Sequence, residues 1–163
     1  MVLRFMLWFV KLGYWLIDVF VSSAILHVYG TYGFMSDGHR FLNEMPVKNV
    51  VSWTSLMVGY SRNNEPKEAV NIYQQLRREG VTCNANSLAT MISSCWLLED
   101  EWLGLQVLAH VVMYGLEMDI SVENALIAMF GSFGRVDDAC YAFHRMEECD
   151  MEWRNVIQSR EIR

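Results

Sequence analysis

The sequence predicts an all-α protein, an α-α superhelix (solenoid) of stacked antiparallel helical hairpins. Three observations lead to this prediction. Residues 19–45 are nearly repeated 101 positions later at 120–146, residues 72–84 are similar to 107–119 at a spacing of 35, and apolar residues recur every three or four positions. Repeats of 20–50 residues bury their apolar faces only against neighbouring repeats, so we expect an extended array rather than one globular core.

The longer similarity rests on six identities. They pair Val21, Ala24, Gly30, Gly33, Asp37 and Met45 with Val122, Ala125, Gly131, Gly134, Asp138 and Met146. The shorter similarity pairs Ile72, Leu76, Gly80, Val81 and Asn84 with Val107, Val111, Gly115, Leu116 and Asp119.

Helical spacing predicts the elements in chain order. The expected helices cover about 21–32, 35–45, 53–62, 66–79, 87–96, 101–114, 122–133 and 135–146, and a last one starts near Trp153. The first should bury one face, formed by Val21, Ala24, Ile25, Val28, Tyr29 and Tyr32. Gly33 and Gly134 should end equivalent helices in a left-handed conformation, which glycine adopts without steric cost. Pro46 should stop the second helix, and Pro66 suits the first turn of the fourth.

These helices divide the chain into four hairpin repeats between two partial ones. The expected repeats are a short one at 19–49, a standard one at 50–84, a long-type one at 85–119 and a short one at 120–150. Residues 1–18 should be the trailing helix of a preceding repeat and 151–163 the leading helix of a following one. We therefore expect a short or truncated array without polar end caps.

Composition favours a reducing compartment and gives no sign of a strong polyanion binder. The net charge is −6, which disfavours non-specific nucleic-acid binding in bulk but leaves room for a local basic surface. Cys83, Cys95, Cys140 and Cys149 are unevenly spaced, so we expect free buried thiols rather than a zinc site or disulfides. The apolar start is interrupted by charges, so it predicts no membrane span, and it lacks the composition of a transit peptide or secretory signal.

No group of residues has the spacing of a catalytic or metal site. The four histidines form neither H-x-E nor H-E-x-x-H, and we expect each to be a partly buried helical residue. The carboxylates near residues 147–152 suit an exposed connection rather than an acid–base pair. The sequence therefore predicts a protein that is not an enzyme and needs no cofactor.

The aromatic residues Trp53, Tyr60, Trp96 and Trp102 should pack between helices.

Two segments carry a family resemblance. The runs DVFVSSAILHVYGTYGFMSDGHRFLNEMPVKNVVSWTSLMVGYSRN and NALIAMFGSFGRVDDACYAFHRME resemble plant pentatricopeptide repeat proteins, and within them the subclass that alternates 35-, 35- and 31-residue motifs. The resemblance implies a helical solenoid that binds single-stranded RNA in organellar RNA processing or editing, one base per repeat. It implies that the protein is located in the mitochondrion or, alternatively, the chloroplast. It also implies that separate processing or editing factors supply the catalysis.

The resemblance also implies which residues contact RNA. The fifth residue of a repeat and its last residue select the base, which gives Ser23 with Asn49, Thr54 with Asn84, Ala89 with Asp119, and Asn124 with Asp150. The second residues hold the base between side chains, namely Phe20, Val51, Asn86, Ser121 and Met151. Phe20 and Val51 suit that apolar role, whereas Asn86 and Ser121 depart from it. Ala89 has no hydrogen-bonding group, so its repeat should space rather than select.

Two other functions stay open at this point. The helical groove could hold a peptide or a partner protein, and the acidic balance favours such a scaffold. The chain could also be a truncated gene product without a function of its own. Polar fifth-position residues in a common register favour RNA.

Overall fold

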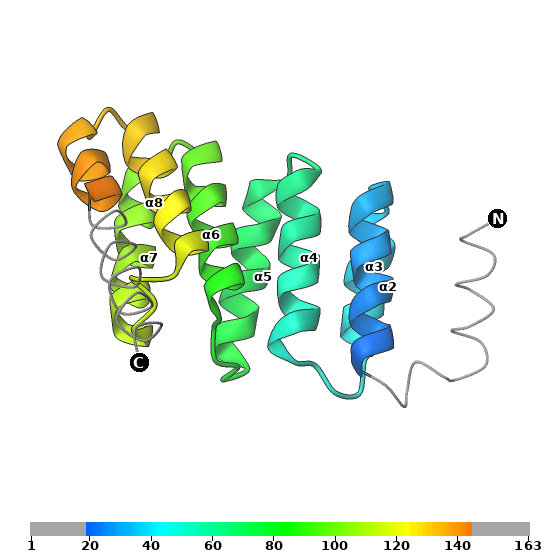
Figure 1. Cartoon of the computed structure of the whole chain (residues 1–163). Helices are drawn as coiled ribbons and strands as arrows, with labels where there is room; N and C mark the ends of the chain where they lie inside the picture. Colours follow the sequence, from blue (N-terminus) through cyan, green and yellow to red (C-terminus); the bar gives the residue numbers. More distant parts are fainter. Residues whose placement is uncertain (1–18, 145–163) are drawn as a thin grey trace, which may run out of the picture.

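The computed structural model describes residues 19–144, which form a stack of helices without strands in that range (Figure 1). The helices are α2 (Val19–Tyr32), α3 (Met35–Glu44), α4 (Val50–Arg62), α5 (Pro66–Arg78), α6 (Ala85–Leu97), α7 (Glu101–Tyr114) and α8 (Ile120–Ser132). Residues 136–144 are also helical. The predicted all-α class is confirmed. The predictions for 1–18, Cys149, Asp150, Met151 and the helix near Trp153 lie outside the described residues.

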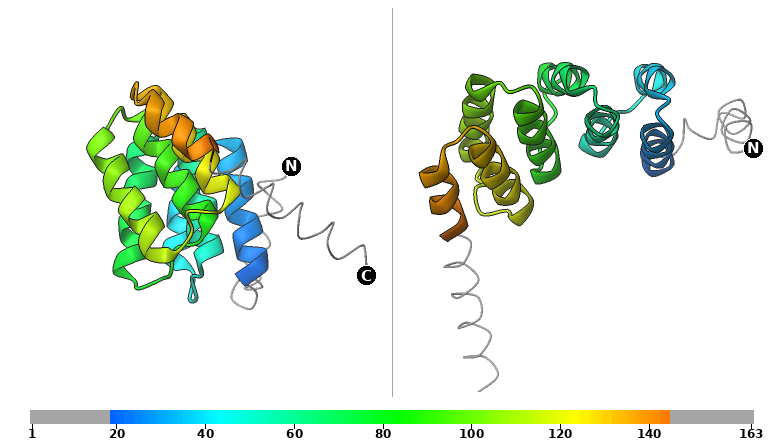
Figure 2. Two further views of the ribbon diagram at one scale, coloured as in Figure 1. Left: turned by 60° about the vertical axis from the view of Figure 1, so that its left-hand side comes forward. Right: turned by 90° about the horizontal axis from the view of Figure 1, so that it is seen from above.

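The helices form antiparallel pairs arranged in two layers. Seen from above, α2 and α4 lie in one layer while α3 and α5 lie in the other, and the array curves toward α8 (Figure 2). Within the first layer α2 packs on α4, α4 on α6 and α6 on α8. We call α2, α4, α6 and α8 the inner helices. Each of them contacts at least one other inner helix, and α2, α4 and α6 also contact the partner helix of their own pair, so the core is continuous along the stack.

Burial on α2 differs from the single face expected for it. Ile25 and Tyr29 are buried as predicted, but Ala24 and Tyr32 are exposed. The buried set extends to Ser22, Ser23, Leu26 and Gly30. The physical reason is that α2 packs on both α3 and α4, so its buried surface is wider than one apolar stripe. Small polar residues close to the neighbouring backbone fill part of that surface.

Caps set the helix starts two residues earlier than the apolar pattern suggested for α6 and α8. Asn84 accepts a hydrogen bond from the Ser87 backbone N–H at 2.9 Å and its own N–H donates to the Ser87 hydroxyl, a capping box. Asn49 forms the same box with Ser52. A side chain that accepts from the first-turn N–H groups stabilises a helix by about 1 kcal/mol. The sequence periodicity does not include these capping residues because they are polar.

Glycine ends two equivalent helices in the left-handed conformation that was predicted. Gly33 has φ 76° and Gly134 has φ 71°. Asn63, which follows α4, closes the first of these ends from the neighbouring repeat. Its side-chain amide donates to the carbonyl oxygens of Gly30 and Gly59, both at 2.8 Å.

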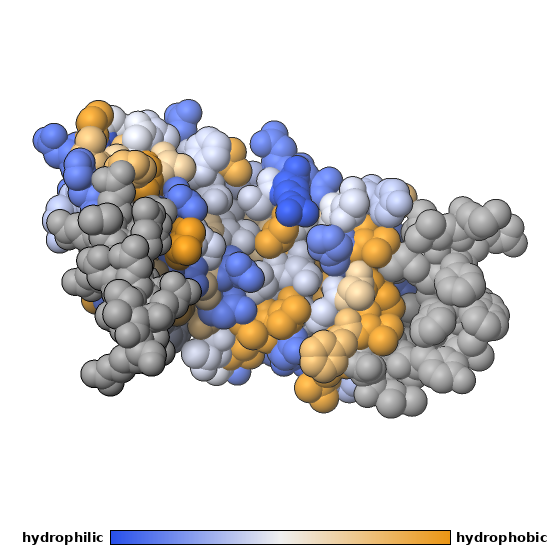
Figure 3. Space-filling view, in the orientation of Figure 1, coloured by the Kyte–Doolittle hydropathy of each residue, from blue (hydrophilic) through white to orange (hydrophobic). Residues whose placement is uncertain are grey.

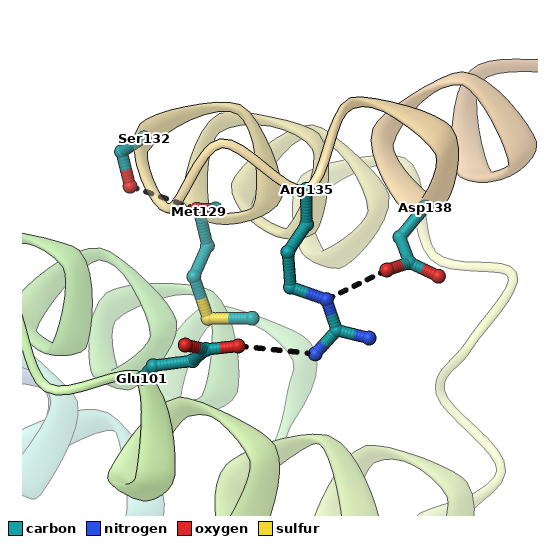
Figure 4. Close-up of polar contacts among 5 residues, drawn as sticks. All are labelled: Glu101, Met129, Ser132, Arg135 and Asp138. Atoms are coloured by element: carbon teal, nitrogen blue, oxygen red, sulfur yellow. Dashed lines mark hydrogen bonds and ion pairs between the residues drawn. The ribbon is translucent and has the colours of Figure 1, made fainter.

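An arginine joins the last two described hairpins (Figure 4). Arg135 Nε donates to Asp138 Oδ2 at 2.6 Å, its Nη1 lies 3.4 Å from Glu101 Oε1, and its guanidinium lies 5.2 Å from the centre of the Phe130 ring. In the same figure the Ser132 hydroxyl donates to the Met129 carbonyl oxygen at 2.7 Å. These groups are partly exposed, so each ion pair contributes at most about 1 kcal/mol.

Several side chains lie in other environments than predicted. Trp53 and Tyr60 are buried between helices as expected, but Trp102 is 72% exposed and Trp96 is 37% exposed, so the packing prediction is wrong for Trp102 and incomplete for Trp96. Cys83 and Cys95 are buried free thiols, whereas Cys140 is exposed. His27 and His144 are exposed rather than partly buried. Each exposed residue lies on a helical surface that no described neighbour covers.

Candidate nucleic-acid interface

A groove of about 650 Å³ runs across the inner helices. Residues of α4, α6 and α8 line it, together with His27 of α2 and the capping residue Asn84. The inner helices lie toward the viewer in Figure 1, and the same face in Figure 3 is pale over the middle of the array, between orange and blue patches. The lining is mainly of small side chains, which leaves room for a ligand to approach the helix backbones.

Equivalent positions of successive helices line this groove in rows. The second residues of α4, α6 and α8 form one row, made of Val51, Asn86 and Ser121. The fifth residues form the next, made of Thr54, Ala89 and Asn124. A third row, at the ninth position, consists of His27, Val58, Ser93 and Ala128. The groove therefore presents one set of side chains per hairpin at a regular spacing.

The Thr54 hydroxyl offers a hydrogen-bond acceptor to the groove. It donates to the Val50 carbonyl oxygen at 2.7 Å, one helical turn earlier, and the residue is 8% exposed. With its proton held by the helix, the remaining lone pairs of the oxygen can accept from a ligand N–H group. Ser23 is held in the same way, by the Val19 carbonyl oxygen at 2.8 Å. These two fifth-position hydroxyls therefore share one chemistry.

Asn84 offers a complementary donor to the same groove. Its Oδ1 accepts from the Ser87 backbone N–H at 2.9 Å, and this leaves its NH2 group to face a ligand in the groove that it lines. The capping box fixes the orientation of the amide. An acceptor and a donor thus lie at the edge of the groove between α4 and α6, and such a pair can bind a polar edge of an unstacked base.

The predicted contact residues fall into three groups. Thr54, Asn84, Asn124 and Val51 line the groove across the inner helices. Phe20, Ser23 and Asn49 do not line it, although Phe20 is 81% exposed and Asn49 caps α4. Asp150 lies outside the described residues.

Ten of the described lining residues were not predicted. The three with the largest side chains are His27, Arg62 and Trp96. His27 is the ninth residue of α2 and Trp96 the twelfth of α6, so extending the helical register from the second and fifth positions to the ninth and twelfth would have indicated both. Arg62 follows the twelfth residue of α4 and carries no such signal.

Charge in the groove differs from charge on the chain. The net charge of the chain is −6, yet no Asp or Glu is among the described residues that line the groove, and Arg62 adds a cation. Asp119, the last residue of the third predicted repeat, is not part of the lining. Hydrogen bonds from Ser121 lower the pKa of its carboxyl group, so Asp119 stays ionised as the N-cap of α8. A groove free of carboxylates suits a polyanion such as RNA better than the overall charge suggests.

Other site types find no support in the part of the chain that the structure describes. Within 19–144, no group of three His, Cys, Asp or Glu side chains is placed to hold a metal ion. Over the same residues, each helix is too short or too polar to cross a bilayer.

Comparison with known proteins gives two family matches. The model of the PPR repeat family matches residues 48–96, and the model of the PPR repeat matches residues 124–151. The first covers α4, α5 and most of α6, and the second starts within α8.

Proteins of Arabidopsis thaliana are similar over most of this chain. A mitochondrial pentatricopeptide repeat-containing protein is 33% identical over 86% of the chain, and another pentatricopeptide repeat-containing protein is 32% identical over 94%. A chloroplastic one is 30% identical over 86%. The chain spans 24%, 18% and 17% of the lengths of these relatives. Together with the stacked hairpins, these matches support the identification of this chain as a plant pentatricopeptide repeat protein.

Proposed function

We propose that this chain binds single-stranded RNA along the groove of its inner helices, with one base per repeat. The observation that carries the proposal is a groove in which fifth-position side chains recur in register and no described lining residue is acidic. Proteins of this repeat family are generally RNA-binding factors of organellar RNA processing. Repeat arrays bind unstacked bases through two or three side chains per repeat.

The proposed reading units are the repeats 19–49, 50–84, 85–119 and 120–150. Following the family resemblance, a hydroxyl residue with asparagine prefers adenine, so Ser23 with Asn49 and Thr54 with Asn84 each select adenine. Asn124 with Asp150 selects uracil, and Ala89 with Asp119 selects no base. Phe20 and Val51 hold bases from the side. Protein and RNA run in the same direction, so the preferred sequence is A-A-N-U from 5′ to 3′.

The geometry at Thr54 supports a role in selection. The hydroxyl oxygen accepts and the Asn84 amide donates, and each is held by a bond to its own helix. A base whose edge matches them forms two hydrogen bonds. A mismatched base leaves a polar atom unpaired, which costs about 1–3 kcal/mol.

We propose an organellar location, in the mitochondrion or alternatively the chloroplast. Relatives are named for both compartments. The chain would not catalyse RNA processing or editing itself, and separate factors bound to the same RNA would supply the catalysis. No metal or organic cofactor is part of this proposal.

The proposal is tested by RNA binding in competition with heparin. The full chain should bind an A-A-N-U RNA at micromolar affinity or weaker, because few repeats contact it, and the affinity should fall as salt rises. The preference over a scrambled RNA should persist when heparin is present. Tight, salt-insensitive binding to any RNA, or no binding at low salt, would contradict the proposal.

A protein-binding scaffold is the second candidate, and the outer surface of α7 favours it. Trp102, Val112 and Met113 are 72%, 58% and 62% exposed on this helix. The outer surface of the equivalent helix α5 instead carries the exposed polar residues Lys67, Asn71 and Gln74. Exposed apolar faces of this kind mark protein contacts.

The two candidates can be separated with a double variant on α7. Trp102→Ser with Val112→Ser should abolish association with a protein partner and leave the RNA affinity unchanged. Loss of RNA binding in this variant would place RNA on the outer surface and contradict the groove assignment.

A further inference from the structure

Trp96 lines the groove, where most of the other lining side chains are small. It lies on the last turn of α6, is 37% exposed and lines the groove of about 650 Å³. It also lines a second hollow of about 560 Å³, which Leu97, Glu99, Ser132 and Phe133 complete. Trp96 therefore lines both hollows and is partly open to a ligand.

No other described inner helix has a large side chain at this position. Trp96 is the twelfth residue of α6, and the twelfth residues of α2, α4 and α8 are Gly30, Ser61 and Gly131. A tryptophan that served only to pack the stack should be buried like Trp53, which is 1% exposed. Its partial exposure on the groove side needs a different explanation.

Trp96 shares a helix face with the one fifth-position residue that cannot form a side-chain hydrogen bond. Ala89, Ser93 and Trp96 follow one another at spacings of four and three residues, and all three line the groove. Side chains on a helix lean toward its N-terminus, so the indole leans toward Ser93 and the space above Ala89. The repeat without a polar reading group thus has an exposed aromatic ring on the same face.

We propose that Trp96 is a base-stacking residue that binds the nucleotide at the third repeat by its face instead of its edge. The inference rests on the proposed RNA-binding function and deepens it. Stacking accepts every base, because each has a π face, and it is stronger for the larger purines. The third position therefore contributes affinity without a strict base choice.

The charges around Trp96 suit a nucleotide on the groove side. Arg62 lines the same groove as Trp96 and can pair with a phosphate, while Glu99 lines the second hollow. A phosphate is attracted toward Arg62 and repelled from Glu99. The strand should therefore pass on the groove face of the indole.

The test measures binding of the full chain to A-A-X-U RNAs at low salt, with X as adenine, cytosine or an abasic spacer. The wild-type protein should bind the adenine RNA about tenfold more tightly than the abasic one, in line with stacking energies. Trp96→Ala should bind the adenine RNA about tenfold more weakly than the wild type does. Its affinity for the abasic RNA should equal that of the wild type. A 2-aminopurine at X should be quenched on binding to the wild type and not on binding to Trp96→Ala.

Two variants control for structural effects. Trp102→Ala removes a more exposed tryptophan outside the groove, so it should bind like the wild type and quench 2-aminopurine. Trp96→Phe keeps an aromatic face and should retain most of the affinity, whereas Trp96→Leu keeps the bulk alone and should behave like Trp96→Ala. Thermal unfolding of each variant shows whether the fold is intact.

The outcomes separate this inference from the proposed function. RNA binding with equal affinity and quenching in the wild type and Trp96→Ala would overturn the stacking role while the groove assignment stands. A lost adenine-over-abasic preference in Trp96→Ala, together with flat base choice at the second repeat, would support stacking and contradict edge reading by Thr54. Absence of RNA binding by the wild type would overturn both.

Discussion

The contact between α2 and α4 differs from the contact between α6 and α8, although both join inner helices of adjacent hairpins. In the first, a Cβ atom added to Gly30 would lie 2.8 Å from Gly59 Cα, so the two backbones meet directly. At the equivalent positions of α6 and α8 stand Trp96 and Met129. The first contact brings two backbones together, whereas the second has a large side chain at each of these two positions.

The difference shows that two residues at matching positions of similar repeats can contribute differently to packing. Gly131 is the counterpart of Gly30 in the 101-residue similarity, yet a Cβ on Gly131 would meet no described atom within 4 Å. Asn63, whose amide donates to both glycine carbonyls in the first contact, is replaced by Phe133 at the equivalent place after α8. The structural role of a repeated residue therefore depends on the helix that packs against it.

The largest expected effect is at the backbone contact. Gly30→Ala should lower the free energy of unfolding by about 3 kcal/mol, because the added methyl group meets the Gly59 backbone and the helices must separate. Gly131→Ala is the matched control and should be neutral or stabilise by up to about 1 kcal/mol, since alanine favours the helix and the space is open. Chemical denaturation of both variants measures this. Equal losses would show that the two contacts do not differ.

The second-largest expected effect is on base choice, and it should be greater for the pair that lines the groove, Thr54 with Asn84, than for Ser23 with Asn49. Thr54→Asn with Asn84→Asp should move the preference of the second repeat from adenine to uracil by about 1–3 kcal/mol, measured on four RNAs that differ at one position. The N-cap of α6 should survive, because Asp119 caps α8 with a carboxylate.

The matched change is Ser23→Asn with Asn49→Asp, which alters the same residue types outside the groove lining. It should shift base preference less. A flat panel for both double variants would contradict edge reading, and the scaffold function would gain. An equal shift for both would show that the groove extends further along α2 than its lining indicates.

A smaller effect is expected at Gly33 and Gly134, two of the left-handed glycines. Gly134→Val should cost about 1–2 kcal/mol from backbone strain alone, because no described atom lies near its added Cβ. Gly33→Val should cost more, since its Cβ would lie 3.0 Å from Asn63 Oδ1 as well. The thermal midpoints of the two variants, with exposed Arg40→Ala as a mild control, test this order. An unchanged midpoint for Gly134→Val would refute the strain argument.

The smallest expected effect is a pH dependence of stability at the contact between Tyr73 of α5 and His110 of α7. His110 Nδ1 lies 2.9 Å from the Tyr73 hydroxyl, and burial, with a smaller contribution from the charge of Arg77, lowers the pKa of His110 below its ordinary 6.5. The unfolded chain therefore binds this proton more readily than the folded chain. Stability should be complete above about pH 6.5 and fall as the pH drops through the folded pKa.

A thermal scan between pH 5 and 8 measures this, and His110→Gln should flatten that part of the profile. His39 and Tyr60 form the corresponding 2.9 Å contact between α3 and α4, so His39→Gln is the comparison variant in the first region. A profile that His110→Gln leaves unchanged would assign the pH dependence to other groups.

Much of the architecture follows from local signals. The 3.6-residue periodicity, the prolines and the glycine helix ends predict every described helix, because these signals depend on backbone geometry within a few residues. The register of the repeats also places Thr54 and Asn124 at equivalent fifth positions and Val51 at a second position, and all three line the groove. Equivalent positions of stacked helices lie in one row whenever the hairpins are alike.

The tertiary structure decided the rest. The wide buried surface of α2, the exposure of Trp96 and Trp102, and the meeting of Gly30 with Gly59 depend on which helix lies beside which. The position of a residue along its helix is the same whether that residue faces a neighbouring backbone, a groove or solvent. The sequence pattern alone therefore does not distinguish these environments for a glycine or a tryptophan. The sequence by itself determined the helices, their order and their repeat, because hydrogen bonds and apolar spacing act locally. Only the packing of neighbouring hairpins decided which repeated residues close the stack and which remain open to a ligand.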